Sequence, residues 1–578
     1  MKRYTADFET STWLPNESFV WAWAICEIGN VENIRIGNTI ESFMELVEKE
    51  QNPIILFHNL KFDGEFILYY LLKNGFTHTT KDKRQDKTFT TIISDMGLFY
   101  EIEVYFKVGK KPKKVTFQDS MKIINQSVES IAKTFKLEES KLKIDYNEVR
   151  EKGHILTKEE EEYIKHDVII VAKGLDYLYS MGLTRITAGS NALNEYKDII
   201  TKKQFEKVYY KLTFECDKDL RQAYKGGFTY LNPIYEGIDV GEGEVLDVNS
   251  LYPSVMYNCL LPFGEPFFYE GKYKEDKVYP LYIQRITCSF KIKKGHIPTI
   301  QIKHRQFIDN EYLESSNDEI VALTLTNVDL KLFLEQYDVE DLTYISGWKF
   351  KAMRGLFKDY IDKWIGIKNQ ATIDGNKGMR QVAKIMLNSL YGKFATGMEM
   401  KSKIPYLEDD IVKYKITEAE LRDGVYLPMG AFITAYAREK TIRTSQAIKT
   451  YSLEKYGEDL YCYSDTDSIH TLLPIEELKQ FCEIDDVELG KWKHESHFTK
   501  ARFVRQKTYL EMINGEIKIT CAGLPSRCYD QVEWKNFKVG MKVDGKLRFK
   551  HVKGGVNLVN EEFTLKADKK LINAIKKI

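Results

Sequence analysis

The sequence predicts a multidomain protein in which an α/β unit is followed by a larger α+β unit. The chain has 578 residues, and at ordinary domain sizes such a length corresponds to roughly three to five domains. Its first third alternates strand-like apolar runs with helical patterns, which is typical of α/β domains. The remainder alternates β-rich and helical blocks less regularly, which favours an α+β architecture.

The composition is that of a globular protein and leaves nucleic-acid binding open. Hydrophobic residues make up 43% and charged residues 29%, and the formal net charge is zero. For nucleic acids the distribution of charge matters more than its sum, and basic clusters occur at 107–114, 291–305, 500–507 and the C-terminal tail. Eight scattered cysteines without a C-x-x-C pair indicate reduced thiols and no zinc site. We expect no membrane span, because no run approaches about 18 apolar residues.

The first predicted strand, YTADFETS, carries two carboxylates. Asp7 and Glu9 are two residues apart, so the alternation of a strand places both side chains on one face. Two carboxylates on a buried face repel each other unless a cation neutralises them, and carboxylate oxygens suit Mg²⁺ or Mn²⁺. The alternative is an ordinary solvent-facing edge of a strand.

The clearest helix is predicted over residues 157–181. Thr157 and Glu160 fit a capping box at its start, and an apolar stripe at helical spacing follows. Tyr163 and Asp167 are i,i+4 neighbours on the face that flanks this stripe. Both side chains are therefore expected at the edge of the core, where an Asp needs a partner.

Asp63 lies between the buried strand NPIILFHN and the helix that follows it. A carboxylate in this position is commonly a helix cap. If it joins Asp7, Glu9 and Asp167, however, the carboxylates describe a two-metal site for phosphodiester hydrolysis. The Tyr163 hydroxyl would then orient the attacking water.

The second half of the chain supplies three more carboxylates. Asp247 ends the strand in EVLDVNSLYP, and Asp465 and Asp467 lie at the apex of a hairpin predicted in YCYSDTDSIHTLL. Each of them alone is more simply read as turn chemistry. If the two elements are neighbours in one sheet, the carboxylates converge on two Mg²⁺ ions, an arrangement that nucleotidyl transfer requires.

Several blocks separate these carboxylates along the chain. Residues 263–356 look β-rich, a helical hairpin with the turn TIDGNKG is expected over 357–396, and a short polar stretch covers 397–427. A long helix, GAFITAYAREKTIRTSQAIKTYSLEKYG, then leads into the acidic hairpin.

The helical hairpin offers positive charge. Arg380, Lys384, Asn388 and Tyr391 follow one another at helical spacing and share one face. A core helix would not place such side chains together without anionic partners, and triphosphate oxygens suit the two cations. The Tyr391 ring is expected to stack on an incoming base pair. The alternative is a solvated helix face with one Tyr.

Three motifs of the first third resemble the exonuclease motifs of proofreading DNA polymerases. The patterns D-x-E, N-x-x-F-D and Y-x-x-x-D read here DFET, NLKFD and YIKHD, in the family's order. They contain Asp7 and Glu9, Asn59 and Asp63, and Tyr163 and Asp167. The conjunction of the three motifs is far more specific than any one of them.

Motifs of the second half resemble those of family B DNA polymerases, and of their protein-primed branch in particular. DVNSLYP (247–253), KIMLNSLYG (384–392) and YSDTDS (463–468) are similar to the three polymerase motifs. YKGG (224–227), TAYAR (434–438) and KTY (507–509) resemble motifs of the branch found in bacteriophages of the phi-twenty-nine type. The resemblance extends over essentially the whole chain.

This resemblance implies a ribonuclease H-like 3′–5′ exonuclease domain followed by a right-hand polymerase domain with palm, fingers and thumb. Two insertions of the branch contact the terminal protein that primes replication and close around DNA. The implied divisions are exonuclease 1–187, palm 188–262 and 428–528, first insertion 263–356, fingers 357–396, second insertion 397–427 and thumb 529–578.

The function implied is a template-directed DNA polymerase with 3′–5′ proofreading. The resemblance further implies protein-primed, processive, strand-displacing replication of a linear viral genome in the cytoplasm of a bacterial host cell. The expected partners are template–primer DNA, deoxynucleoside triphosphates and a terminal protein primer, and we expect a monomer that does not bind membranes. The expected cofactor is Mg²⁺ or Mn²⁺, with two ions in each active site.

Individual roles also follow from the resemblance. The metal ligands implied are Asp7, Glu9, Asp167, Asp247, Val248 and Asp467. Asp465 is implied to serve the metal on the primer side. Lys141 is implied to assist the exonuclease, Tyr252 to exclude ribonucleotides, and Lys368 to bind triphosphate with Arg380, Lys384, Asn388 and Tyr391. The DNA contacts implied are Thr10, Asn59, Phe62, Ser120, Met121, Tyr224, Gly226, Gly227, Ser250, Thr434, Arg438, Lys507 and Tyr509.

The sequence departs from the pattern of the protein-primed branch at two places, and three other functions compete with that of a proofreading polymerase. The segment 510–522 is shorter than the usual hairpin before the thumb, and the finger linker 369–379 is longer. The rivals are a nuclease whose C-terminal half only binds DNA, a non-catalytic replication scaffold, and an RNA-synthesising palm enzyme. The intact acidic sets and Lys384 argue against the first two rivals, and the bulky Tyr252 beside Asp247 argues against the third.

Overall fold

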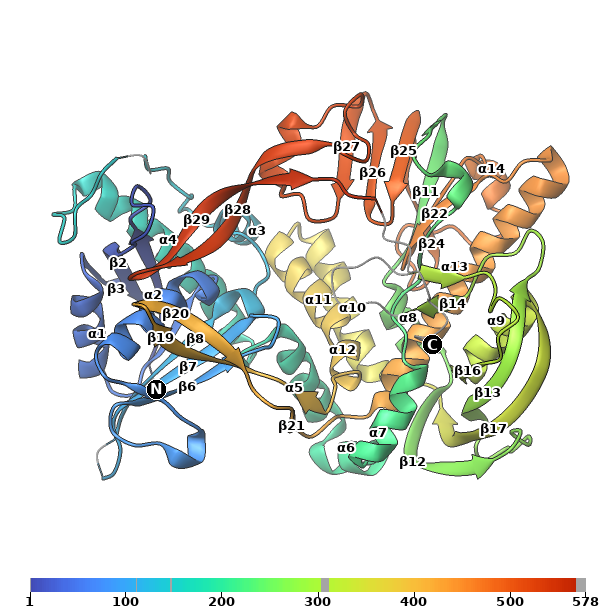
Figure 1. Cartoon of the computed structure of the whole chain (residues 1–578), viewed down its shortest axis with the longest axis horizontal. Helices are drawn as coiled ribbons and strands as arrows, with labels where there is room; N and C mark the ends of the chain where they lie inside the picture. Colours follow the sequence, from blue (N-terminus) through green and yellow to red (C-terminus); the bar gives the residue numbers. More distant parts are fainter. Residues whose placement is uncertain (1, 111, 146–147, 303–310, 568–578) are drawn as a thin grey trace.

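The computed structural model describes residues 2–110, 112–145, 148–302 and 311–567 (Figure 1). The basic tail singled out above lies almost wholly outside these ranges. The N-terminal unit and the palm lie on opposite sides of α10, α11 and α12 in Figure 1. Within the described part of the chain, no helix is long and apolar enough to cross a bilayer.

An eight-stranded sheet forms the core of the N-terminal unit, in the order β3-β2-β1-β4-β8-β7-β6-β5. β1 is antiparallel to β2 and parallel to β4, which is parallel to β8. The strands are β1 (Arg3–Thr10), β2 (Val20–Glu27), β3 (Asn30–Gly37), β4 (Ile54–Phe57), β5 (Thr77–His78), β6 (Thr88–Ile93), β7 (Phe99–Lys107) and β8 (Lys113–Asp119).

Helices cover both faces of this sheet, which confirms an α/β unit. α1 (Ile40–Lys49) and α2 (Leu60–Lys73) bury the even-numbered side chains of β1 in one apolar cluster. α4 (Lys158–Ser180) packs on the other face, where Thr5 Oγ1 donates to Val168 O at 2.8 Å. Strand alternation therefore aims the odd-numbered side chains of β1 at α4.

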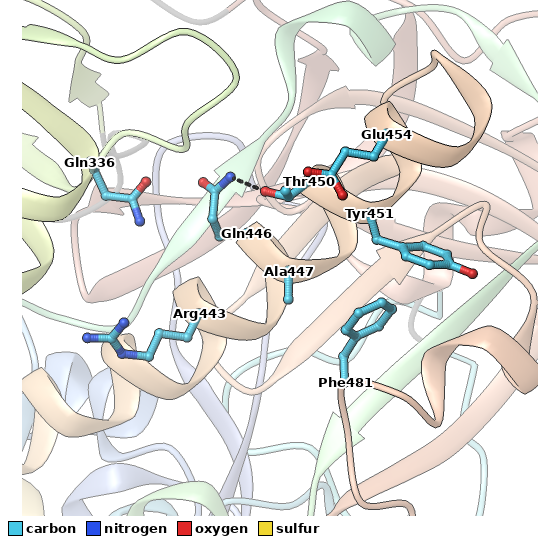
Figure 2. A pocket seen from close by; sticks show the side chains of 8 residues that line it. All are labelled: Gln336, Arg443, Gln446, Ala447, Thr450, Tyr451, Glu454 and Phe481. Carbon is cyan, nitrogen blue, oxygen red and sulfur yellow. Dashed lines mark hydrogen bonds between the residues drawn. The ribbon is translucent and has the colours of Figure 1, made fainter.

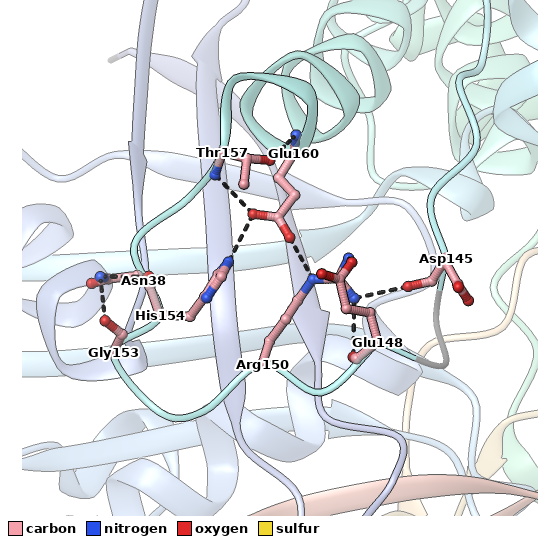
Figure 3. A network of polar contacts seen from close by, with 8 residues as sticks. All are labelled: Asn38, Asp145, Glu148, Arg150, Gly153, His154, Thr157 and Glu160. Carbon is pink, nitrogen blue, oxygen red and sulfur yellow. Dashed lines mark hydrogen bonds and ion pairs between the residues drawn. The ribbon is translucent and has the colours of Figure 1, made fainter.

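The start of α4 confirms the predicted capping box. Thr157 Oγ1 accepts from Glu160 N at 3.2 Å, and the Glu160 carboxylate accepts from Thr157 N at 2.9 Å. The same carboxylate also bonds Arg150 and His154, both from the preceding loop (Figure 3). This network joins the loop to the first turn of the helix that carries Tyr163 and Asp167.

The palm is a five-stranded sheet in the order β24-β11-β23-β22-β9. Its strands are β9 (Thr229–Leu231), β11 (Gly243–Val248), β22 (Tyr461–Asp465), β23 (Ser468–Thr471) and β24 (Trp492–Phe498). α13 (Leu427–Tyr456) and α8 (Leu251–Asn258) pack on one side, where Leu246 and Ile469 belong to the largest apolar cluster. The acidic hairpin and the strand of Asp247 are thus neighbours in one sheet, which is the condition that the sequence left open for a shared site.

The fingers are the predicted helical hairpin. α10 (Lys358–Ile373) and α11 (Lys377–Ser389) are joined at Gly375, whose φ of +62° suits glycine. The expectation that one helix continues to Tyr391 is wrong, because α11 ends and a short α12 (Tyr391–Phe394) begins after Leu390.

The β-rich block at 263–356 is a four-stranded sheet in the order β12-β17-β13-β16. It contains β12 (Leu261–Glu270), β13 (Leu281–Ile292), β16 (Val321–Thr326), α9 (Asn327–Gln336) and β17 (Tyr337–Met353), with the separate pair β14 (Ile300–Ile302) and β15 (Glu311–Leu313). The stretch 397–427, expected only to be polar, holds the hairpin of β19 (Lys403–Glu408) and β20 (Ile411–Ile416) and the pair of β18 (Glu399–Met400) and β21 (Glu420–Leu421).

Beyond the palm, a second sheet carries the KTY segment. Its order is β10-β25-β26-β27, formed by β10 (Asp239–Val240), β25 (Lys500–Arg505), β26 (Thr508–Ile513) and β27 (Glu516–Cys521). The chain then forms the long hairpin of β28 (Lys542–Val552) and β29 (Gly555–Thr564), which reaches across to the N-terminal unit in Figure 1.

This hairpin packs closely on α2 and on the loop after β1. A side chain at Gly555 would place its Cβ 2.5 Å from the Phe66 ring, and Ser18 N donates to Lys553 O at 2.8 Å. The buried Glu65 accepts from Tyr414 of β20 at 2.7 Å, and its other oxygen lies 3.1 Å from His551 Nε2 of β28. Three distant segments therefore meet around α2.

Two candidate carboxylate sites

The first site lies between β1 and α4. Asp7 and Glu9 extend from β1 toward α4, as the alternation of the strand requires, and Asp167 is buried on α4. Burial and the charge of Asp167 raise the pKa of Asp7 to about 7. Burial, followed by the charges of Asp7 and Asp167, also raises the pKa of Glu9 well above its ordinary value. The three carboxylates therefore oppose one another's charge.

Lys141 offsets part of this repulsion. Its Nζ lies 3.2 Å from Asp167 Oδ2, and the charges of Asp167, Asp7 and Glu9 raise its pKa against the opposing effect of burial. The other oxygen of Asp167, Oδ1, is buried without a hydrogen-bond partner. An orphaned carboxylate oxygen among repelling carboxylates fits a bound cation.

Asp63 is connected to the same strand. Its Oδ1 accepts from Phe8 N at 3.2 Å, so this buried carboxylate bonds to the backbone of β1 between Asp7 and Glu9. Burial and then the charge of Asp7 raise its pKa. Asn59 precedes α2 with a φ of +92°, and its N–H donates to Asp119 Oδ1 at 3.2 Å.

The side chains predicted to hold a primer end lie around this site with different exposures. Thr10 is buried, whereas Met121 is half-buried. Tyr163, which was predicted to orient the attacking water, is also buried. Phe62 is half-buried and packs on Phe549 of β28, with ring centroids 6.1 Å apart. Ser120 is fully buried and donates to Phe57 O at 3.0 Å, so its hydroxyl does not face solvent in this conformation.

The second site lies at the end of the palm sheet. Asp247 pairs across the sheet with Ser468, and Val248 N donates to Asp467 O at 2.7 Å, so the acidic turn lies directly beside β11. Burial and the charge of Asp467 raise the pKa of Asp247 to about 7. Burial is also the main cause that raises the pKa of Asp467, and the charge of Asp465 adds to it.

Asp465 has different surroundings from Asp467. Lys507 Nζ lies 2.7 Å from both of its carboxylate oxygens, and Thr229 Oγ1 donates to Oδ1 at 3.1 Å. The Tyr463 hydroxyl donates to Oδ2 at 3.3 Å. Thr229 was not among the residues that the sequence pointed to, because it reaches Asp465 only through the pairing of β9 with β22.

The acidic turn is supported by the YKGG segment. A Cβ on Gly227 would lie 2.6 Å from Thr466 Oγ1, so only glycine fits against the turn. Thr466 itself has a φ of +61°, and its N–H donates to Phe228 O. Arg438 NH1 donates to the carbonyls of Lys225 and Gly226 at 2.9 and 2.7 Å.

Two residues predicted to bind template are buried within the protein in this conformation. Arg438 forms an ion pair with Asp329 of α9, 2.7 Å between NH2 and Oδ2. Thr434 Oγ1 donates to Gly430 O at 3.1 Å within α13. The motif gave no indication of Asp329, which belongs to the β-rich block and not to the palm.

The finger helices present cations toward the second site. Arg380, Lys384 and Asn388 are exposed on one side of α11, as predicted. Burial, and then the charges of Arg380 and Lys384, lower the pKa of Lys368 on α10, whose Nζ lies 3.4 Å from Ser250 Oγ at the start of α8. Among the described residues, these three cations form no ion pair with a carboxylate, and they therefore suit an anionic ligand.

Tyr252 and Tyr391 stack on each other at the entrance to this site. Their ring centroids are 4.1 Å apart and their planes differ by 27°. Tyr252 lies on α8, in the segment that directly follows the strand of Asp247, while Tyr391 begins α12. The carboxylates, the finger cations and this aromatic pair thus come from three segments that are distant in the sequence.

A hollow of about 440 Å³ lies away from both sites, along the outer face of α13 (Figure 2). Arg443 in its lining pairs with Glu335 and Glu439 at 2.9 Å each, and Gln446 donates to Thr450 at 3.0 Å. These groups satisfy one another. Among the residues that the structure describes, no three His, Cys, Asp or Glu side chains form a ready-made metal cluster, at either site or elsewhere.

Comparison with known proteins identifies the family. Residues 45–161 and 147–481 match the family described as "DNA polymerase type B, organellar and viral". The DNA polymerase of Bacillus phage Nf is 45% identical, and the alignment covers 98% of this chain and 100% of that protein. The DNA polymerase of Bacillus phage phi29 (phi-twenty-nine) is 44% identical over 98% and 99% of the two chains.

Solved structures agree with the sequence relatives. Phi29 DNA polymerase in an orthorhombic crystal form matches with a TM-score of 0.91 at 43% identity, covering 98% of this chain and all of that one. The complex of that enzyme with primer–template DNA and incoming nucleotides matches with a TM-score of 0.90. The chain therefore belongs to the organellar and viral type B DNA polymerases, as a DNA-directed DNA polymerase of the phi29 type that also carries a 3′–5′ exonuclease.

Proposed function

We propose that the palm site adds nucleotides to a primer and that the site between β1 and α4 removes them. The observation that carries this assignment is that Asp247 on β11 lies beside Asp467 in the acidic turn, opposite the exposed cations of α11. A triphosphate bound there would be held by cations at one end and by carboxylates with bound metal at the other.

The residues fit divalent cations at both sites, although no ready-made cluster is present. In the palm, Asp247, Asp467 and the carbonyl of Val248 would hold two Mg²⁺ or Mn²⁺ ions. In the N-terminal unit, Asp7, Glu9 and Asp167 would hold two more. Once bound, such ions lower the pKa of an attacking oxygen and offset the charge that develops on phosphate.

The other residues bind and orient the substrates. Lys368, Arg380 and Lys384 bind the triphosphate, and Tyr391 stacks on the new base pair beside Asn388. Tyr252 fills the space of a ribose 2′-hydroxyl and so excludes ribonucleotides. On the primer side, Lys507 neutralises Asp465, and Tyr509 lines the same turn.

In the nuclease site, Tyr163 orients the attacking water and Lys141 stabilises Asp167. Asp63 positions β1 through Phe8 N. Single-stranded primer is held by the residues around this site and its entrance, namely Thr10, Asn59, Phe62, Ser120 and Met121. The template strand is held through Tyr224, Gly226, Gly227, Ser250, Thr434 and Arg438, and the last two must become accessible for direct contact.

The replication context is inferred from relatives. A solved relative holds primer–template DNA and incoming nucleotides, and the relatives from Bacillus phages Nf and phi29 are DNA polymerases. We assign to this chain the same substrates, a terminal protein as primer, strand displacement on a linear phage genome, action as a monomer, and the cytoplasm of the bacterial host. The domain limits stated in the sequence analysis, with insertions at 263–356 and 397–427, are retained in this assignment.

Two variants test the division of labour. Asp467→Asn should abolish nucleotide incorporation and leave digestion of single-stranded primer unchanged, while Asp7→Ala with Glu9→Ala should do the reverse. Both are measured on one 5′-labelled primer with Mg²⁺, and on a primed single-stranded circle the wild type should give products longer than one circle. Incorporation by Asp467→Asn at the wild-type rate would remove this residue from the site.

A further inference from the structure

A buried His–Glu pair lies beneath the palm carboxylates. His470 of β23 and Glu511 of β26 are 2% and 0% exposed, and His470 Nδ1 lies 2.8 Å from Glu511 Oε1. This hydrogen bond joins the palm sheet to the sheet that carries the KTY segment. The other oxygen, Oε2, is buried without a hydrogen-bond partner, and the nearest cation, Lys518 Nζ, is 3.9 Å away.

His470 faces the same side of the palm as the catalytic carboxylates. It pairs across the sheet with Val245, two residues before Asp247, and with Tyr463, two residues before Asp465. Cross-strand partners, and residues two apart in a strand, share a face. His470 therefore lies one pair further along the same face from Asp247 and Asp465.

An aromatic cluster connects the pair to the primer-side turn. The His470 ring lies 5.3 Å from Tyr463, 5.7 Å from Phe503 and 5.1 Å from Tyr509 between centroids. Tyr463 links Lys507 to Asp465, because its hydroxyl accepts from Lys507 N at 2.9 Å and donates to Asp465 Oδ2 at 3.3 Å. Any movement of this cluster would move Lys507 relative to Asp465.

The pair is a poor source of stability in itself. A buried carboxylate with one partner loses its hydration, and apolar replacements of such pairs are often neutral or stabilising. A hydrogen bond between two strands of different sheets does, however, fix their relative position. Here it fixes β26, and with it Lys507 at the start of that strand, against β23.

We propose that His470 and Glu511 are positioning residues for the primer end. By fixing β26 on the palm, they hold Lys507 on Asp465 and so keep the 3′ end of the primer in the polymerase site instead of the nuclease site. This inference rests on the proposed function of the palm site. Both residues are buried, so the pair acts through Tyr463, Lys507 and Tyr509 and not by touching the substrates.

Three variants separate the hydrogen bond from simple packing. His470→Phe keeps a ring and removes the bond, and adding Glu511→Leu also removes the buried carboxylate. His470→Asn places an N–H donor near the former Nδ1 position. We expect the double variant to fold with a Tm at or above that of the wild type, and His470→Asn to recover most of the wild-type behaviour.

The readout is the partition of a matched, 5′-labelled primer–template between extension and digestion with Mg²⁺. In the double variant, the nucleotide concentration at which net synthesis replaces digestion should rise about tenfold. The KM for primer–template should rise by the same factor, because the loss of one hydrogen bond can weaken binding about tenfold. The kcat at saturating primer–template and the digestion of single-stranded oligonucleotide should stay unchanged.

Glu244→Leu is the matched control. This buried carboxylate lies on the same strand as Asp247 but on the opposite face, 2.7 Å from His494 Nε2 and 3.0 Å from His497 Nδ1. It should alter stability without altering the partition. A stable double variant with wild-type partition and KM would overturn the proposal. A wild type that cannot extend the primer would instead overturn the proposed function.

Discussion

Asp247 and Asp467 oppose each other's charge, and at the residue scale this conflict is the clearest sign of a functional site. A carboxylate placed for stability would be exposed or paired, whereas burial and Asp467 hold the pKa of Asp247 at about 7. The sequence motifs pointed to both residues, and the structure brings them side by side. The motifs could not show Thr229 or Asp329, because they reach the site through strand pairing and through an ion pair between distant segments.

Asp247→Asn should increase stability in metal-free buffer above pH 7. The pKa of Asp247 is about 7 in the fold and 3.8 in its ordinary state, so the fold favours the protonated carboxyl. Its contribution to stability is therefore present below pH 4 and is lost as the pH rises through 7. Thermal unfolding with EDTA should show a higher Tm for the variant at pH 8 and no difference near pH 3.5. Added Mg²⁺ should raise the Tm of the wild type more than that of the variant, which keeps the carboxylates of the N-terminal site.

Tyr252→Val should admit ribonucleotides. The Tyr252 ring is held by its stacking on Tyr391 at 4.1 Å, so its position beside the nucleotide site is rigid. A smaller side chain would leave space for a 2′-hydroxyl. The ratio of kcat/KM for deoxy- over ribonucleotides should fall by at least tenfold. Undiminished discrimination would place the selective side chain elsewhere and reopen the RNA-synthesising alternative.

Elements with strong local signals were predicted correctly, and elements that depend on distant partners were not. The capping box of α4, the turn between α10 and α11 and the long α13 follow from neighbouring residues alone. The hairpin of β19 and β20 was missed, since its apolar residues Leu407, Val412 and Tyr414 are explained only by packing on the N-terminal unit. The break between α11 and α12 at Leu390 was also missed, because the apolar residues keep helical spacing across it.

At the same scale, Glu160→Gln should weaken the start of α4. Burial opposes the charge of Glu160, but Arg150, the N–H of Thr157 and His154 lower its pKa to about 2 (Figure 3). The charged carboxylate therefore contributes stability above pH 4.5, and this contribution is lost as the pH falls toward 2. The variant should have a lower Tm at pH 7 and approach the wild type at acidic pH. A constant Tm difference at all pH values would contradict this account.

On the scale of the whole molecule, the two ends of the described chain are joined by the hairpin of β28 and β29. Contacts with Phe66, Ser18 and Glu65 hold it on the N-terminal unit while its base belongs to the opposite half (Figure 1). This closure was not visible in the sequence. The roles of Gly555 and His551 become clear only when α2 packs against them, since Gly555 lies against the Phe66 ring and His551 bonds Glu65.

Glu65→Gln should loosen this closure. The hydrogen bond to Glu65 is the main cause that raises the pKa of His551, so the charge of Glu65 supports the contact with β28. Amide hydrogen exchange in β28 and β29 should become several-fold faster, while exchange in β1 and β2 stays the same. Lys73→Gln, which removes an exposed pair with Asp410, is the control and should have almost no effect.

The N-terminal unit is consequently completed by two later stretches of chain, the hairpin at 403–416 and the tip of the hairpin formed by β28 and β29. A protease that cuts once between α4 and the next helix, α5 (Ala188–Ile200), would sever the chain without releasing either half. The two pieces would still share the hairpins and the surfaces that bury them. Polypeptides split at this point should therefore reassociate when they are expressed together.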